Sequence, residues 1–371
     1  MIGVALTLLI FVFLIVYYVS KRKFDYWKKR KIPYSEPVPF LGNYGPFIVQ
    51  NKYMGQLAQK ICQQFPEAPY VGAFYGTEPT LMVQDPEVIK NIMTKDYYYF
   101  SSREISKYTH KEVFTQNLFF TYGDRWKVLR QNLTPLFSSS KMKNMFYLID
   151  KCSHVFEDML DSEFETGKVK AVRPIMAKFT MDCIGSCAFG IDTGTMAKGS
   201  ENNPFKVIGD LLFLDTYYRG LKVAFRAIWP ALFYGLRMKS FPPDADEFFN
   251  KVMKEVFESR NYKPSNRNDF VDLILNLKKE NYISGDSLSN MKGDNKKVNL
   301  EIDEEMLVAQ CLLFFAAGFE TSATTLQYTL YELAKNPDSQ ERVIEEIDGY
   351  LRKHNNKLGY ECITELPFTE A

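Results

Sequence analysis

Helical periodicity dominates the pattern of apolar and polar residues along the chain. Apolar side chains recur every three or four residues through most of the sequence, which is the spacing that places them on one face of an α-helix. The pattern predicts helices over residues 124–136, 141–165, 171–189, 204–218, 243–262, 268–278, 303–335 and 337–352. We therefore expect a mainly α-helical fold.

Strand-like segments are confined to one short region. Residues 70–75 and 80–84 are rich in aromatic and apolar side chains, and the turn-forming residues 76–79 separate them, so they predict a small β-hairpin. Asp85 and Pro86 then open a helix, with Asp85 as the N-cap. Residues 279–299 are rich in Ser, Gly, Asn and Lys and predict a mobile surface loop.

The N-terminus is apolar, and a basic segment follows it. Residues 2–19 carry no charged side chain and would span about 27 Å as a helix, close to the thickness of a bilayer core. We expect a transmembrane signal anchor over residues 1–20, a basic and proline-rich hinge over residues 21–42, and a folded domain over residues 43–371. The basic flank predicts that this domain stays in the cytosol. A cleaved secretory peptide is the alternative.

The composition suits a large apolar interior and excludes some classes of function. Hydrophobic residues make up 46% of the 371 residues and aromatic residues 15%. The 46 basic and 45 acidic residues leave a net charge of +1, so no chain-wide nucleic-acid footprint is present. The six cysteines form no Cys-x-x-Cys pair, and we expect reduced thiols. Cys183 and Cys187, one helical turn apart, are interpreted as packing residues.

Residues 217–243 mix apolar and basic side chains between two predicted helices. Trp229, Leu232 and Leu236 are interleaved with Arg226 and Arg237. This mixture suits insertion into a membrane interface. An ordinary packed helical corner is the alternative.

The helix predicted over residues 303–335 contains polar side chains that packing alone does not explain. Residues 307–315 are apolar on almost every side, which indicates a buried helix. Glu320 and Thr321 follow, and buried polar groups cost about 1–3 kcal/mol unless they find partners. Ala317 and Gly318 leave room, and the Thr321 hydroxyl can bond the Ala317 carbonyl four residues earlier. A kinked core helix with a back-bonded threonine also accounts for the pattern.

A tryptophan and an arginine four residues apart lie on the helix predicted over residues 124–136. Trp126 and Arg130 share one face of this helix, beside an apolar stripe. An indole N–H and a guanidinium in this position can both bind one partly buried anion. A purely structural pair is the alternative.

The order of these segments resembles that of the cytochrome P450 family of heme-thiolate monooxygenases, in its microsomal, foreign-compound-metabolising branch. The anchor, the proline-rich hinge, the hairpin, Trp-x-x-x-Arg at Trp126 and Ala-Gly-x-Glu-Thr-Ser at residues 317–322 follow each other as in that family. The resemblance covers essentially the whole chain and implies a cytochrome P450 fold.

The resemblance implies a role for each motif. Heme b would be held with Trp126, Arg130 and Arg103 at its propionates, and with Ala317 and Gly318 facing it. Thr321 would hydrogen-bond the oxygen held at the iron, and Glu320 would relay protons through water. Six further residues are candidates for the substrate pocket by position, although each also fits a plain core: Phe119, Phe120, Phe213, Leu214, Phe315 and Ala316.

The resemblance also implies partners and a location. NADPH-cytochrome P450 reductase would deliver electrons from NADPH, with cytochrome b5 as an optional second partner. The substrate would be a lipophilic small molecule such as a xenobiotic, a toxin or an endogenous lipid. We expect the endoplasmic reticulum membrane, with the catalytic domain on its cytosolic face and no nucleic-acid partner.

The chain departs from the pattern of this family at the heme ligand. The family continues with a Glu-x-x-Arg helix and a Phe-x-x-Gly-x-x-x-Cys-x-Gly loop, whose thiolate binds the iron. These 371 residues contain neither motif, so we expect an N-terminal fragment without the axial cysteine. Two functions remain open: the anchor and distal half of an NADPH- and O2-dependent monooxygenase, or a non-catalytic membrane-anchored fragment that cannot hold thiolate-ligated heme.

Overall fold

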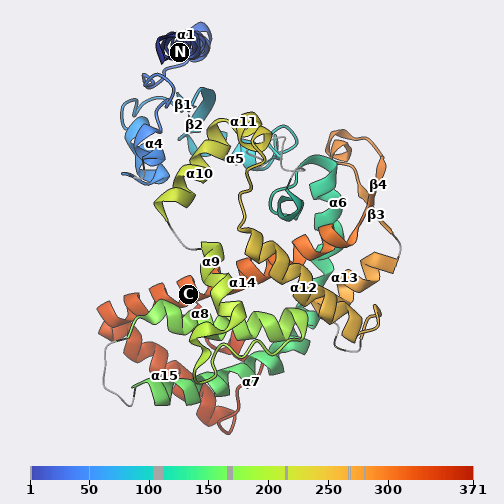
Figure 1. Ribbon diagram of the computed structural model, residues 1–371. Coiled ribbons are helices and arrows are strands. Elements are labelled where there is room, and N and C mark those ends of the chain that lie inside the picture. Colours follow the sequence, from blue (N-terminus) through green and yellow to red (C-terminus); the bar gives the residue numbers. More distant parts are fainter. Residues whose placement is uncertain are drawn as a thin grey trace. The chain divides into compact units, whose positions relative to one another are not determined.

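The computed structural model describes residues 2–49, 51–102, 112–164, 170–213, 216–265, 267, 269–279 and 281–370 (Figure 1). The chain divides into two compact units. The first comprises residues 1–112, 215–240 and 291–294, and the second comprises residues 113–214, 241–290 and 295–371.

The first unit combines one hairpin with short helices. Its strands are β1 (Tyr70–Tyr75) and β2 (Glu78–Val83), which pair antiparallel with Tyr70 opposite Val83 and Tyr75 opposite Glu78, as predicted. Its helices are α1 (Ile2–Lys23), α2 (Asp25–Lys29), α3 (Gly45–Ile48), α4 (Met54–Cys62), α5 (Pro86–Met93), α10 (Tyr217–Ile228) and α11 (Pro230–Gly235). The Asp85 carboxylate caps α5 by accepting from the Val88 N–H at 2.9 Å, which confirms the predicted helix start.

The segment predicted as a hinge packs on this hairpin. Trp27 of α2 is buried, and its Nε1 donates to the Ala73 carbonyl at 2.8 Å. A Cβ on Gly72 would lie 2.5 Å from the Trp27 ring, so only glycine lets the indole approach the strand. The Gly72 N–H also donates to the Pro33 carbonyl at 2.8 Å. The connector is therefore fixed to β1 by both side-chain and backbone contacts.

The segment predicted as either an interfacial loop or a packed corner forms α10 and α11. Phe233 and Tyr234 are buried, and Arg226 Nε donates to the Tyr234 hydroxyl at 2.7 Å. Trp229, Leu232 and others on these helices are exposed. The segment thus has one packed side and one exposed apolar side. The single helix predicted over residues 204–218 is wrong, because α9 ends at Phe213 and Thr216 caps a new helix by accepting from the Arg219 N–H.

The second unit is mainly helical. Its α-helices are α6 (Gly123–Leu133), α7 (Ser139–Phe164), α8 (Val172–Ile184), α9 (Pro204–Phe213), α12 (Pro243–Ser259), α13 (Phe270–Lys279), α14 (Glu304–Lys335), α15 (Pro337–Lys353), α16 (Cys362–Glu365) and α17 (Pro367–Glu370). Shorter turns are η2 (Val113–Thr115), η3 (Thr134–Phe137), the π-helical η4 (Gly185–Phe189) and η5 (Ser200–Asn202). The predicted mainly helical fold is confirmed.

The mobile loop predicted over residues 279–299 is instead largely a second hairpin. Strands β3 (Tyr282–Asp286) and β4 (Lys297–Glu301) pair antiparallel, and η6 (Leu288–Lys292) follows β3. Gln131 of α6 holds β3: its Oε1 accepts from the Asp286 N–H at 2.8 Å, and its Nε2 donates to the Asp286 carboxylate at 3.0 Å. The prediction failed because these contacts with α6 are long-range, and polar composition does not reveal them.

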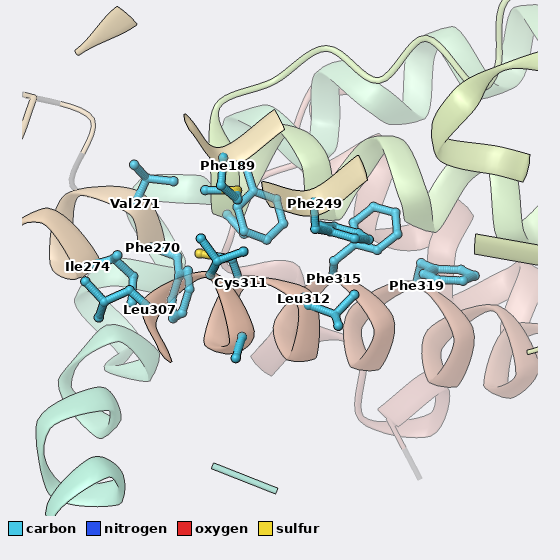
Figure 2. Close-up of a cluster of buried hydrophobic side chains, with 14 of the residues drawn as sticks. Phe189, Phe249, Phe270, Val271, Ile274, Leu307, Cys311, Leu312, Phe315 and Phe319 are labelled. Atoms are coloured by element: carbon cyan, nitrogen blue, oxygen red, sulfur yellow. The ribbon is translucent and has the colours of Figure 1, made fainter. Parts of the chain in front are cut away.

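Helix α14 forms the core of the second unit. Asp303 caps it by accepting from the Met306 N–H at 2.7 Å, and acidic residues in the first turn favour the positive end of the helix dipole. Its residues from Met306 to Leu312 are all buried. Figure 2 shows α14 side chains meeting Phe189, Phe249 and Phe270 from neighbouring segments. By length and composition α14 could also cross a membrane, but 56% of its apolar window is buried inside the protein, as in a core helix.

Candidate functional site

A stripe of small and hydroxyl side chains runs along the exposed side of α14. Ala317, Thr321 and Thr325 are exposed and follow each other at four-residue spacing. The Thr321 hydroxyl donates to the Ala317 carbonyl at 2.5 Å, which confirms the predicted back-bond, and Thr325 does the same to Thr321 at 2.9 Å. Helix α14 remains continuous through this region. We call Ala317, Thr321 and Thr325 the hydroxyl stripe.

Glu320 is held by an arginine from α8. The Nε and Nη2 atoms of Arg173 donate to its two carboxylate oxygens at 3.1 and 2.6 Å, and the Glu320 side chain is 17% exposed. This two-point geometry is the strongest form of a carboxylate–arginine pair. The Thr324 hydroxyl lies 3.5 Å from Glu320 Oε1. Sequence reasoning missed Arg173 because 147 positions separate it from its partner.

Gly318 has a different surrounding from Ala317, although the sequence analysis grouped the two as space beside the heme. A Cβ on Gly318 would lie 2.6 Å from Ile184 Cδ1 and 2.7 Å from Cγ1. In addition, Thr180 of α8 donates its hydroxyl hydrogen to the Phe319 carbonyl at 2.9 Å. Gly318 therefore serves the close approach of α8 to α14, whereas Ala317 belongs to the hydroxyl stripe.

Trp126 and Arg130 lie one helical turn apart on α6. Trp126 is half-buried and Arg130 is exposed. Phe137 ends η3, which follows α6, and its ring stacks on that of Phe314 with centroids 5.4 Å apart. Phe314 precedes Ala317 by one turn of α14. The Phe137–Phe314 pair therefore links η3 to the start of the hydroxyl stripe.

Phe119 and Phe120 occupy a tight turn before α6. Their rings meet edge to face at 5.0 Å, and the Asn117 carboxamide oxygen accepts from both backbone N–H groups at 3.0 and 3.2 Å. Gln310 of α14, fully buried, also holds this turn: its Oε1 accepts from the Leu118 N–H at 2.8 Å. Sequence reasoning missed Gln310. A single amide within an apolar helix was its only signal.

The remaining pocket candidates divide between core and surface. Phe315 is fully buried, with the ring of Phe249 at 5.1 Å and that of Phe319 at 5.3 Å (Figure 2). It is a core residue in this structure. Phe213 is exposed at 38% and meets Phe319 at 5.4 Å, and Ala316 is half-buried against the same core. Leu214 and Arg103 lie outside the described residues.

Comparison with known proteins decides the family. The sequence model for "Cytochrome P450" matches residues 32–371. The chain belongs to the cytochrome P450 family. It is 37% identical to cytochrome P450 6B2 of Helicoverpa armigera over 353 residues, which cover 95% of this chain and 68% of that relative.

Other relatives are also insect cytochromes P450. Cytochrome P450 6k1 of Blattella germanica is 34% identical over 98% of this chain and 70% of its own length. Cytochrome P450 6a2 of Drosophila melanogaster is 33% identical over 98% of this chain and 71% of its own length. These matches confirm the resemblance drawn from the motifs.

Several described residues of this cytochrome P450 have side chains of the kind that would suit one side of a heme. The hydroxyl stripe exposes only small and hydroxyl side chains, and Phe314 lies one turn before it on α14. Arg130 and Trp126 offer a cation and an indole N–H, the donors that suit carboxylates such as propionates.

None of the six cysteines lies in a loop of the kind that binds heme iron in this family. Cys311 is fully buried within α14. Cys62, Cys152, Cys183 and Cys362 lie on helices, and Cys187 lies in η4. Among the described residues, no group of three His, Cys, Asp or Glu side chains is arranged to hold a metal ion.

Proposed function

We propose that this chain supplies the membrane anchor and the distal half of the active site of an NADPH- and O2-dependent monooxygenase of lipophilic small molecules. The observation that carries the proposal is the exposed Thr321 hydroxyl on α14, next to the ion-paired Glu320. A hydroxyl and a carboxylate at the point where a buried helix becomes exposed are the groups that proton delivery needs.

Heme b, when bound, supplies the oxygen activation for the reaction. The chain would hold it through Arg130 and Trp126 at the propionates, with Ala317 leaving its face open. While the Thr321 hydroxyl donates to the Ala317 carbonyl, its lone pairs remain able to accept a hydrogen bond from water. Thr321 therefore holds and orients a proton-donating water at the hydroxyl stripe.

Glu320 would relay protons to that water. Its pairing with Arg173 keeps the carboxylate in a fixed position, and Thr324 offers a neighbouring hydroxyl at 3.5 Å. Proton transfer by Glu320 then requires water between the carboxylate and Thr321. The aromatic pair Phe119 and Phe120 favours apolar substrates, because aromatic rings supply large apolar contact areas.

The partners and location follow from the same proposal. NADPH-cytochrome P450 reductase would provide electrons from NADPH, and cytochrome b5 would be a second electron donor. Helix α1 would anchor the chain in the endoplasmic reticulum membrane, because its apolar residues end in Lys21, Arg22 and Lys23. The exposed apolar side chains of α10 and α11 belong to the same unit as α1 and would contact the lipid headgroup region.

Substitution of Thr321 tests the proposal. In a form of the protein that carries the family's cysteine loop, Thr321→Ala should retain folding and heme content, because it removes only a hydroxyl and a methyl from an exposed position. NADPH consumption should shift from product toward peroxide and water. Thr325→Ala is the matched control, since it removes the same back-bonded hydroxyl one turn away. Unchanged coupling in Thr321→Ala would refute the role of Thr321.

The positions of the six cysteines favour a second function for these 371 residues by themselves, a non-catalytic membrane-anchored fragment. Without a proximal thiolate we expect no stable thiolate-ligated heme. The purified residues 1–371 should be mixed with heme and reduced under carbon monoxide. An unshifted Soret band is expected, and the red-shifted band of thiolate ligation would contradict the fragment hypothesis.

A further inference from the structure

Cys152 of α7 and Cys183 of α8 face each other across two antiparallel helices. The Phe156 and Phe179 rings meet at 4.7 Å, and nearer the start of α7 the Met145 carbonyl accepts from the Cys187 thiol at 3.9 Å. Cys152 lies one turn before Phe156 on α7, and Cys183 lies one turn after Phe179 on α8. The geometry of the two helices thus places these cysteines opposite each other.

The two thiols share a hydrogen bond that makes them chemically unequal. The Cys183 S–H donates to the Cys152 sulfur, which lowers the pKa of Cys152 and raises that of Cys183. Lys151 lowers the pKa of Cys152 further, whereas burial, Asp182 and Asp192 oppose the effect. Burial raises the pKa of the nearby Cys187 to about 12. Cys152 is therefore the nucleophilic member, since the thiolate is the reactive form.

Cys152 and Cys183 are both partly exposed residues. Each is half-buried, and Cys152 packs against the hydrophobic core of the second unit. Cys311, by contrast, is fully buried in α14. An oxidant the size of hydrogen peroxide needs no more room than a pair of water molecules.

We propose that Cys152 and Cys183 form a peroxide-reactive dithiol that closes into a disulfide between α7 and α8. The Cys152 thiolate attacks one oxygen of hydrogen peroxide, the O–O bond breaks, and hydroxide leaves, so that Cys152 becomes a sulfenic acid. The Cys183 sulfur then attacks the Cys152 sulfur, the S–O bond breaks, and water leaves with the Cys183 proton. Two thiols lose two electrons, and one peroxide becomes two waters.

Closure requires a small local movement. A hydrogen-bonded thiol pair must shorten to about 2.05 Å between sulfurs to form the disulfide. The bridge would fasten α7 to α8 directly beside Ile184, the residue that packs on Gly318 of α14. The reaction is independent of heme and of the proposed monooxygenase function.

Peptide mapping of the whole chain tests the proposal. The protein is treated with hydrogen peroxide, its remaining thiols are alkylated, and it is digested with trypsin. Cys152 then lies in the peptide 152–168, and both Cys183 and Cys187 lie in the peptide 179–198. We expect these two peptides to be linked, with a mass two hydrogens below their sum.

Three variants identify the partner cysteine. Cys187→Ser should retain the linked peptides, and Cys183→Ser should lose them. Because serine keeps a hydroxyl donor, Cys152 in Cys183→Ser should stop at the sulfenic acid and be labelled by dimedone. Cys183→Ala removes the donor as well, so the oxidation of Cys152 should be slower there than in Cys183→Ser.

Two results would overturn the proposal. One is a linked pair that persists in Cys183→Ser and disappears in Cys187→Ser. The other needs no variant: Cys152 of the unmodified protein is oxidised no faster than the half-buried Cys62 and Cys362, which serve as internal controls. The second comparison holds even if a cysteine variant fails to fold.

Discussion

At the scale of single residues, Glu320 shows how a partner changes the meaning of a motif. In the sequence it is an acid within an apolar helix, and such a group needs a partner. The structure supplies the Arg173 guanidinium in a two-point contact, with 37% of the Arg173 side chain exposed. The ion pair is therefore partly screened by water, and its contribution to stability is smaller than that of a fully buried pair.

Breaking this pair should have a modest effect on stability. Arg173→Met is expected to lower the free energy of unfolding by about 1–2 kcal/mol, since the pair is two-point but partly exposed. Urea denaturation measures the change. Lys206→Met, which breaks the more exposed Lys206–Asp210 pair, is the control and should cost less. Equal costs for the two variants would show that the Arg173 geometry contributes nothing special.

The thiols of α7 and α8 should differ in their response to pH. The Cys183 S–H lowers the pKa of Cys152, so the Cys152 thiolate forms at a lower pH than in an ordinary cysteine. Burial raises the pKa of Cys187 to about 12, so that residue stays protonated. As pH rises through neutrality, iodoacetamide should modify Cys152 first and leave Cys187 intact. Mass spectrometry checks this order, and coincident pH profiles would contradict it.

At the scale of elements, the contact between α8 and α14 depends on Gly318. Alanine usually stabilises a helix interior by about 1 kcal/mol relative to glycine. Here its Cβ would collide with Ile184, and overpacking typically costs about 1–3 kcal/mol. Gly318→Ala should therefore lower the midpoint of denaturation, whereas Gly349→Ala in α15, where no atom lies within 4 Å, should raise it. In the double variant Gly318→Ala/Ile184→Ala the collision is absent. The loss of stability in this double variant should therefore be smaller than the sum of the losses in the two single variants.

Gln310 should matter for both stability and selectivity. Gln310→Leu leaves the Leu118 N–H and the Gln116 carbonyl without their partner, at about 1–3 kcal/mol for each buried group. Gln310→Glu keeps a side-chain oxygen that can accept from the Leu118 N–H. It should therefore lose less stability at this contact than Gln310→Leu does. Since Leu118 adjoins Phe119 and Phe120, we also expect altered substrate preference among apolar compounds. Unchanged unfolding in Gln310→Leu would refute the assignment.

Elements with strong local periodicity could be predicted from the sequence. Helices α14 and α15 and the β1–β2 hairpin match the predicted ranges within a few residues, because capping residues and apolar spacing act locally. The β3–β4 hairpin was missed because Gln131 and Asn132 of α6 hold it from over 150 positions away. The motif residues Thr321 and Trp126 could be identified from spacing. Their neighbours Arg173 and Gln310 required the fold.

At the scale of the whole molecule, the orientation of the proposed membrane anchor α1 would decide which compartment the rest of the chain occupies. Residues Asn132-Leu133-Thr134 form a glycosylation sequon, but it does not report on this orientation. Asn132 lies within α6, and its side chain donates to the Val128 carbonyl at 2.9 Å and to the Ser284 carbonyl at 3.0 Å. Once α6 has folded, Asn132 is therefore a poor glycan acceptor, and the absence of a glycan there would not establish a cytosolic location.

A better probe of orientation is available after α15. Lys357→Thr creates a glycosylation sequon at Asn355 in an exposed turn. If the basic residues after α1 hold the chain in the cytosol, this variant should remain unglycosylated in microsomes. A sequon added before Met1 should acquire a glycan as the positive control. A glycan at Asn355 would reverse the predicted topology.

The three tryptophans occupy three different parts of the molecule, and this gives the chain an intrinsic fluorescence assay. Trp27 is 6% exposed against the first hairpin, and Trp229 is 38% exposed where α10 meets α11. Iodide in the buffer should therefore quench Trp229 and spare Trp27, while brominated lipids should dim Trp229 if α10 and α11 enter the headgroup region. Trp126 lies on the Arg130 face of α6, so heme bound there should quench it by energy transfer. Single-tryptophan variants would separate connector folding, membrane contact and heme binding without any added label.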